Sequence, residues 1–160
     1  DFLSDIAAQA QDYAGFNLLV GGHDSLWHYT NSDTKGPQNL PPGIYGLSNA
    51  TLDTPWPKVV LGKAKLLALL ETGPISHRAL ADVVSSQQLA DQNSLIAQGL
   101  DSTMESTLSP QFIVTDTYGT RSSTTLWFDA KAQASWLELS FNAQGVLREV
   151  QHKEMSLADR

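Results

Sequence analysis

The sequence predicts an α+β fold, in which helices and antiparallel strands occupy separate parts of the chain. Helical spacing of apolar residues is confined to the start and the middle, whereas the last third alternates apolar and polar residues between turn-forming clusters. A regular succession of strand and helix would instead indicate a parallel sheet. The 160 residues fit one domain, and folding at this size hides roughly 70% of the unfolded chain's surface.

The composition is that of a soluble globular protein. Apolar residues make up 41% of the chain and charged residues 17%, and no run approaches the ~18 apolar residues of a membrane span. The formal net charge of −7 opposes binding to nucleic acid. The absence of cysteine excludes disulfides, thiolate metal sites and a cysteine nucleophile within the chain. The chain opens without a secretory signal, which favours a cytoplasmic location.

The first third predicts a helix followed by a β-hairpin. Apolar residues recur at helical spacing over residues 1–14, and Gly15 ends the pattern. Strands follow at residues 16–20 and 26–30, on either side of a glycine-containing polar turn. Residues 31–43 hold prolines and glycines that sustain neither periodicity, so we expect a loop there.

The next segment predicts a junction between a strand and a helix. Residues 44–47 have the composition of a strand, and Asp53 or Thr54 would cap a helix whose first turn tolerates Pro55. Asn49 therefore lies where a strand end faces a helix start. Backbone N–H groups and a side-chain amide converge at such a junction, a geometry that suits an anion or a developing oxyanion.

The middle of the chain predicts two helices and an irregular segment. The helix after the junction is strongly apolar and should end near residues 72–74. Ser76 would cap a second helix, whose buried residues fall within 80–84. Residues 87–110 are polar and weakly patterned, so we expect irregular structure with one helical turn.

The C-terminal third predicts an antiparallel meander, because short β-rich runs alternate with turn residues. The expected strands are residues 112–114, 120–128, 136–141 and 146–152, and the expected turns are residues 129–133 and 142–145.

Histidine and tryptophan patterns favour structural roles. The four histidines lie far apart in the sequence and none is placed four residues from another, so we expect no metal site; they are His23, His28, His77 and His152. The pair His23 and His28 could meet across the hairpin, but ordinary surface histidines are the simpler interpretation. The four tryptophans could stack on a flat ligand, although packing is the commoner role of aromatic residues in strands.

Arg121 stands among hydroxyl residues at the start of an otherwise apolar strand. Arginine is seldom buried without a partner, so it either points to solvent or is held inside to meet a carboxylate, a thiolate or a substrate anion. The sequence leaves these alternatives open.

Two runs of the chain resemble signature segments of the transport and Golgi organisation protein 2 family, also called the Asn-Arg-Asp-Glu (NRDE) family. They are residues 45–58 (Tyr-Gly-Leu-Ser-Asn-Ala-Thr-Leu-Asp-Thr-Pro-Trp-Pro-Lys) and residues 118–124 (Tyr-Gly-Thr-Arg-Ser-Ser-Thr). Residues 15–21 resemble the hairpin that precedes the first signature, and residues 40–43 resemble its lead-in. The resemblance covers most of the chain and is weakest over residues 87–110.

The resemblance implies a fold and two site residues. The family is similar to the N-terminal-nucleophile hydrolases, which stack two antiparallel sheets between helical layers (αββα). Both runs also look like active-site segments of the choloylglycine and penicillin V acylase branch. By that similarity Asn49 would supply an amide N–H to an oxyanion or leaving group. Arg121 would lie beside the nucleophile and favour its thiolate form, or contact the substrate.

The nucleophile that the resemblance implies is absent from the chain. Hydrolases of that branch attack with an N-terminal cysteine, and the family's naming segment also lies near the N-terminus. The first residues of this chain instead resemble the family's middle, so we expect residues 1–160 to be the C-terminal portion of one domain, inactive by itself. Its sheets would then expose edges that the missing portion or another chain completes.

Three functions remain open at the level of sequence. The first is a small-ligand protein with Asn49 and Arg121 lining its pocket; the resemblance implies haem trafficking, with haem as a possible cargo rather than a resident cofactor, and links to lipid and Golgi homeostasis. The second is an amidohydrolase that cleaves a non-peptide C–N bond. The third is a protein-interaction module.

Overall fold

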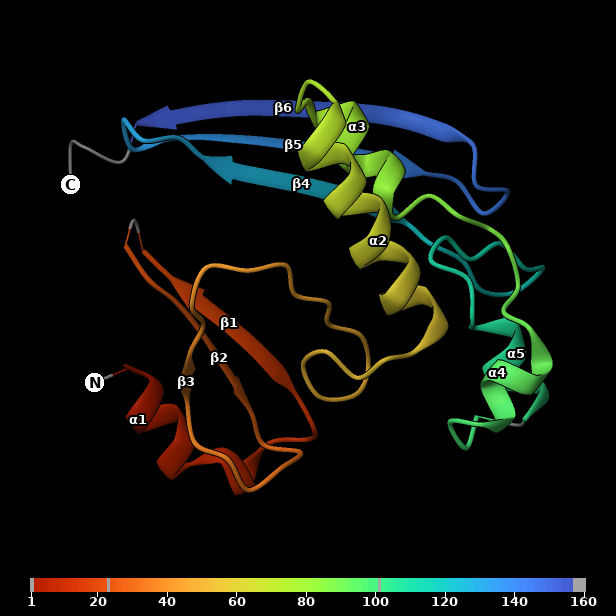
Figure 1. Ribbon diagram of the computed structural model, residues 1–160, viewed down its shortest axis with the longest axis horizontal. Helices are drawn as coiled ribbons and strands as arrows, with labels where there is room; N and C mark the ends of the chain where they lie inside the picture. The colour runs from red at the N-terminus through yellow and green to blue at the C-terminus, as the bar shows by residue number, and fades with distance from the viewer. Residues whose placement is uncertain (1, 23, 101, 157–160) are drawn as a thin grey trace. The chain divides into compact units, whose positions relative to one another are not determined.

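The computed structural model describes residues 2–22, 24–100 and 102–156. Within these residues the chain is a mixed α/β protein with two three-stranded antiparallel sheets (Figure 1). Residues up to Thr54 and residues from Pro55 onward form two compact units, each of which contains one sheet. The positions of the two units relative to one another are not determined.

The first unit is a helix followed by a small sheet, as predicted. Its elements are α1 (Phe2–Ala8), a 3-10 turn (Ala10–Asp12), β1 (Asn17–Gly21), β2 (Leu26–Thr30) and β3 (Gln38–Asn39). The strands lie in the order β1-β2-β3. The predicted hairpin is confirmed, with β1 and β2 antiparallel and Leu19 opposite His28.

An apolar cluster joins α1 to this sheet. Leu3 and Ala10 pack with Tyr29 of β2, and the Phe16 ring meets the edge of Tyr29 at a centroid distance of 5.7 Å. The Asn31 side chain fastens the end of the helical segment to the hairpin, because its amide donates to the Ala10 carbonyl and accepts from the Phe16 N–H. The core of this unit is therefore apolar with a polar clasp at one end.

The predicted strand at residues 44–47 is wrong. These residues form no ladder, and the third strand is instead the short β3 inside the predicted loop. Gly46 and Asp53 exchange two hydrogen bonds: the Asp53 N–H donates to the Gly46 carbonyl, and the Asp53 carboxylate accepts from the Gly46 N–H. Both backbone groups of Gly46 are thus satisfied within its own loop rather than by a neighbouring strand.

The second unit combines four helices with a meander in the described residues. Its elements are α2 (Pro57–Thr72), α3 (His77–Val83), α4 (Gln92–Ile96), α5 (Thr103–Thr107), β4 (Ser122–Phe128), β5 (Gln133–Phe141) and β6 (Leu147–Ser156). The strand order β4-β5-β6 confirms the predicted meander. Figure 1 shows α3 against one face of this sheet, where it packs on β4.

Helix starts were predicted with mixed success. Ser76 caps α3 as expected, and its hydroxyl accepts from the Ala79 N–H. The cap predicted for α2 is wrong, since the helix begins at Pro57 after Trp56, which makes no side-chain capping bond. Proline occupies the first helical position because its missing N–H would be unpaired there.

Residues 87–110 contain more regular structure than expected. Both α4 and α5 are single turns that begin with a side-chain cap. Before α5, Ser102 and Glu105 form a reciprocal capping box, and these hydrogen bonds lower the pKa of Glu105. The strand predicted at residues 112–114 is reduced to one bridge between Val114 and Gly119.

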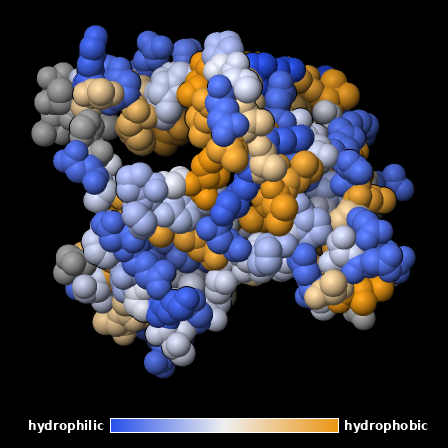
Figure 2. Space-filling view, in the orientation of Figure 1, coloured by the Kyte–Doolittle hydropathy of each residue, from blue (hydrophilic) through white to orange (hydrophobic). Residues whose placement is uncertain are grey.

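The apolar residues of α2 are largely exposed. Val59 is buried, whereas Val60, Leu67 and Leu70 are about half exposed, and Figure 2 shows apolar side chains gathered over this helix. None of the helices in the described ranges has the length and apolarity needed to cross a membrane.

Candidate functional site

The first signature segment is fastened to the hairpin of the first unit by a chain of side chains. The Asn17 amide donates to the Ala50 carbonyl over 3.0 Å, and its oxygen lies 3.0 Å from Nε2 of His28. Because that amide oxygen only accepts, the Nε2 atom of His28 carries the hydrogen. Asn49 itself is exposed in the adjoining loop.

Asp53 holds the same segment in a specific backbone conformation. Its φ angle is 60°, in the left-handed region that asparagine and aspartate tolerate better than most residues. The conformation is fixed by the two hydrogen bonds that Asp53 exchanges with Gly46. The residue predicted as a helix cap thus closes the signature loop.

A polar cleft of about 120 Å³ lies where this loop meets the sheet. Its lining comes from β2, β3, the loop after β2 and the signature segment, and comprises His28, Thr30, Asp33, Lys35, Gly36, Gln38, Thr51, Leu52 and Asp53. The lining of this cleft therefore includes residues of both charge signs and a buried histidine, all within one unit.

The interpretation of His28 as an ordinary surface histidine is wrong, because its exposed fraction is 4%. It is buried where β2 packs between β1 and β3 and hydrogen-bonds Asn17. His23 lies outside the described residues.

The second signature segment leads into β4. Arg121 is exposed directly before that strand, and its carbonyl accepts from the Phe141 N–H over 2.8 Å. Thr120 pairs with Ile113 through its backbone N–H and its hydroxyl. The sequence left open whether Arg121 points to solvent or is held inside, and in the structure Arg121 is exposed. Asn49 and Arg121 belong to different units, so their meeting in one site stays a prediction.

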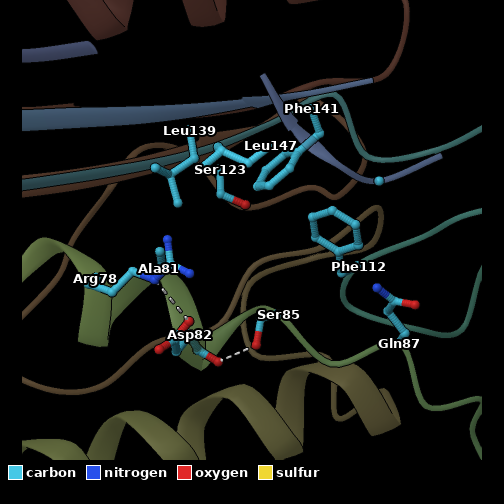
Figure 3. A pocket seen from close by; sticks show the side chains of 11 residues that line it. Arg78, Ala81, Asp82, Ser85, Gln87, Phe112, Ser123, Leu139, Phe141 and Leu147 are labelled. Carbon is cyan, nitrogen blue, oxygen red and sulfur yellow. Dashed lines mark hydrogen bonds and ion pairs between the residues drawn. The ribbon is translucent and has the colours of Figure 1, made fainter. Parts of the chain in front are cut away.

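A cleft of about 190 Å³ lies between α3 and the sheet of the second unit (Figure 3). Arg78 and Asp82 of α3 stand on one side of it, 3.9 Å apart, and Ser123 of the second signature stands on the other. Its apolar part contains Phe112 and Phe141, whose rings meet edge to face at 4.8 Å. A second, wider cleft of about 520 Å³ is lined by Tyr118 of the same signature and by hydroxyl and apolar residues, namely Thr103, Met104, Thr107, Leu108, Thr115 and Thr117.

A buried polar network that the sequence did not predict surrounds His77. Its Nδ1 lies 2.6 Å from the Thr125 hydroxyl and its Nε2 lies 2.8 Å from the Ser135 hydroxyl. His152 lies 3.2 Å from the other side of Ser135, and the His77 ring stacks on Trp127 at 3.7 Å. Packing is thus the observed role of this tryptophan.

The pKa of His77 is lowered from its ordinary value. Burial is the largest cause, His152 acts in the same direction, and Glu154 opposes both. Although His77 and His152 are far apart in the sequence, their ring centroids are 5.2 Å apart. Within the described residues, no three histidine or carboxylate side chains form a group that could hold a metal ion.

Lys58, at the end of the first signature, has a structural partner. Its ammonium group donates to the Leu108 carbonyl over 2.7 Å, which ties the first turn of α2 to the end of α5. Burial lowers the pKa of Lys58. The helical end of the first signature is therefore held in place by a hydrogen bond to the end of α5.

Comparison with known proteins assigns the chain to a family. The sequence model of a family described as Transport and Golgi organisation 2 matches residues 1–143. The chain is 32% identical over 155 residues to the Transport and Golgi organization protein 2 homolog of Bos taurus. This match covers 87% of this chain and 55% of that protein. The corresponding homologs of Mus musculus and Homo sapiens are 30% and 29% identical, over the same shares.

The chain thus spans about half the length of the curated relatives that it matches. The family match and the cattle relative agree with each other, and this chain belongs to the Transport and Golgi organisation 2 family.

Proposed function

We propose that the chain is part of a small-ligand-binding protein of the N-terminal-nucleophile type, in which Asn49 and Arg121 contact the ligand. The observation that carries this proposal is that both signature segments line clefts: residues 51–53 in the first unit, and Tyr118 and Ser123 in the second. The exposed side chains of Asn49 and Arg121 leave their polar groups available to a ligand. Two antiparallel sheets are compatible with the proposed αββα sandwich.

Haem is the ligand to test first, as a trafficked cargo. The cleft beside Tyr118, at about 520 Å³, falls in the range of roughly 300 to 1,000 Å³ that is typical of small-molecule sites. Titration of haem into the full-length protein should shift its Soret band with a saturable dependence. The absence of any spectral change would contradict haem as the cargo, and a thermal-shift titration with a fatty-acyl amide would then test the lipid and amide classes.

The role of Arg121 is tested by substitution to alanine. A hydrogen bond to a charged group contributes roughly 1.5 to 3 kcal/mol, so Arg121→Ala should weaken binding of an anionic ligand about tenfold or more. Arg148→Ala is the matched control, because Arg148 is also exposed but lies on β6, outside both signatures. Equal affinities of these two variants would contradict a ligand contact by Arg121.

A double-mutant cycle tests whether Asn49 and Arg121 serve one ligand. If they do, the loss in binding free energy for Asn49→Ala with Arg121→Ala should differ from the sum of the single losses. Asn39→Ala, an exposed asparagine in β3, combined with Arg121→Ala should be additive. Additivity in both cycles would mean that the two signature residues act independently.

An amidohydrolase is the alternative in which the same two residues stabilise a transition state. It requires a nucleophile outside this chain, because the chain has no cysteine. The full-length protein would need to expose a nucleophile as its first residue after removal of methionine. If that residue is cysteine, its alkylation should abolish turnover of a chromogenic acyl anilide. A second codon for any residue other than cysteine, serine or threonine would exclude this activity.

An interaction module is supported by the exposed apolar residues of α2, among them Val60, Leu67 and Leu70. Unpartnered apolar surface of this kind is frequent at protein interfaces. A saturable small-molecule thermal shift that Arg121→Ala abolishes would favour ligand binding over this alternative.

A further inference from the structure

The polar network around His77 joins α3 to all three strands of the second sheet. His77 is the first residue of α3, Thr125 lies in β4, Ser135 in β5 and His152 in β6. Neither signature segment contributes the two histidines. The network is therefore a second chemical centre, independent of the proposed ligand contacts.

The hydrogens of the neutral network can be assigned without conflict. The Thr125 hydroxyl donates to the Leu137 carbonyl over 3.4 Å, so its oxygen accepts from Nδ1–H of His77. Nε2 of His77 then carries no hydrogen and accepts from the Ser135 hydroxyl. The Ser135 oxygen accepts in turn from Nε2–H of His152. Every polar hydrogen in this network therefore has an acceptor.

One added proton leaves all the hydrogen bonds of the network in place. On His152 it occupies Nδ1, which has no part in these hydrogen bonds, and Nε2–H still donates to Ser135. The His152 side chain is 47% exposed, and the Glu154 carboxylate lies 4.0 Å from its Nε2. Water and a carboxylate thus lie next to this ring.

A second proton cannot be added without breaking one of these hydrogen bonds. If Nε2 of His77 were protonated, the Ser135 hydroxyl would face N–H donors from both histidines and its own hydrogen would lose its acceptor. The two charged rings would lie 5.2 Å apart. Trp127 covers one face of the His77 ring, so water does not reach that face.

Other charges near the network do not relieve this conflict. Among the described residues, β6 presents His152 and Glu154 on this face, whereas β4 and β5 present hydroxyl and apolar groups. Helix α2, which packs against α3, carries Lys58, Lys63, Lys65 and Glu71, and α3 itself carries Arg78 and Asp82, which pair with each other. The charges that shift the pKa of His77 are those of His152 and Glu154.

We propose that the network binds one proton but not two, so that the second proton releases the start of α3 from the sheet. Because α3 forms one wall of the cleft that contains Arg78 and Asp82, this release also opens that cleft. The device responds to mild acid and does not depend on the identity of any ligand.

The test is hydrogen exchange of the α3 amides, combined with NMR titration of the histidine rings from neutral to mildly acid pH. The wild-type rings should titrate in two steps, and the opening constant of α3 should rise by about tenfold per pH unit in the second step. His152→Gln removes the first charge while keeping an amide that can pair with Ser135. It should raise the pKa of His77 and reduce the acid-induced opening several-fold.

Lys153→Gln is the matched control. Lys153 is the next residue of β6, and its charged side chain lies on the face of the strand opposite to His152. It should leave both histidine steps and the α3 exchange unchanged. Persistent protection of α3 through both steps in the wild type would overturn the proposal. So would an unchanged acid response in His152→Gln.

Discussion

The two units fasten a helix to a sheet by different physical means. In the first, Leu3 of α1 packs on Tyr29 within an apolar cluster. In the second, His77 of α3 sits between the hydroxyls of Thr125 and Ser135. Apolar burial is non-directional and insensitive to protons, whereas a hydrogen-bonded histidine depends on which atoms carry hydrogen. The dependence on pH of the packing between helix and sheet should therefore differ between α1 and α3.

The largest expected effect is in the apolar unit. Leu3→Ala should destabilise it by about 3 kcal/mol, the typical cost of a buried leucine truncation. The loss should be the same at neutral and mildly acid pH, because no titratable group is involved. Urea unfolding followed through Trp27 fluorescence measures it, with the exposed Gln11→Ala as control. If the free energy lost in Leu3→Ala varied with pH, the packing of α1 would not be independent of protons and the contrast with α3 would be wrong.

The next effect concerns the polar unit and has the opposite pH behaviour. His77→Phe removes both hydrogen bonds and leaves the hydroxyls of Thr125 and Ser135 to find other partners, at a cost of about 2 kcal/mol near neutral pH. The pKa of His77 is lowered in the folded state, so the unfolded state binds more protons below the ordinary pKa and the wild type loses stability as pH falls. The variant lacks this loss.

The free-energy gap between the wild type and His77→Phe should consequently narrow on acidification. Urea unfolding followed by Trp127 and Trp136 fluorescence, repeated at several pH values, measures the gap. A gap that stayed constant would place the acid sensitivity of the second unit elsewhere.

A smaller loss is expected at the turn that closes the cleft of the second unit. Gly145 has a φ of +72°, and a Cβ there would lie 2.8 Å from Val114 and 3.1 Å from Phe112. Gly145→Ala should therefore cost about 1 to 2 kcal/mol, measured by thermal unfolding. Gly36→Ala is the control, since a Cβ at that position meets nothing within 4 Å. Equal costs would mean that the turn adapts by moving away from Phe112.

The sequence predicted the elements whose determinants are local. The hairpin, the meander and the Ser76 cap each follow from residues within one strand, turn or helix end. The errors arose where a partner outside the local pattern decides. Residues 44–47 look like a strand, but Asp53 satisfies Gly46 from within the loop. Helix α2 begins at Pro57 after Trp56, whereas a cap by Asp53 or Thr54 was expected.

The candidate site was predicted unevenly for the same reason. Motif resemblance located the segments that line the clefts, but it said nothing of the His77 network. Thr125 is 48 positions from His77 and Ser135 is 58 positions from it, so only the register of the meander against α3 brings them together. The burial of His28 likewise depends on β3, a two-residue strand without a sequence signal.

The smallest expected effect sharpens the comparison most directly. Arg78 and Asp82 form an ion pair at 3.9 Å with side chains that are 70% and 65% exposed, so Arg78→Ala should change the free energy of unfolding by less than about 0.5 kcal/mol. Arg78 follows His77 in α3, but its guanidinium pairs with Asp82, whereas the charges that shift the pKa of His77 are those of His152 and Glu154. The acid-induced opening of α3 should therefore be the same in this variant as in the wild type, when both are followed by hydrogen exchange. If Arg78→Ala altered the acid response as much as His152→Gln, net charge on α3 would be the cause. The difference between the two units would then lie in surface charge rather than in the buried hydrogen-bond chain.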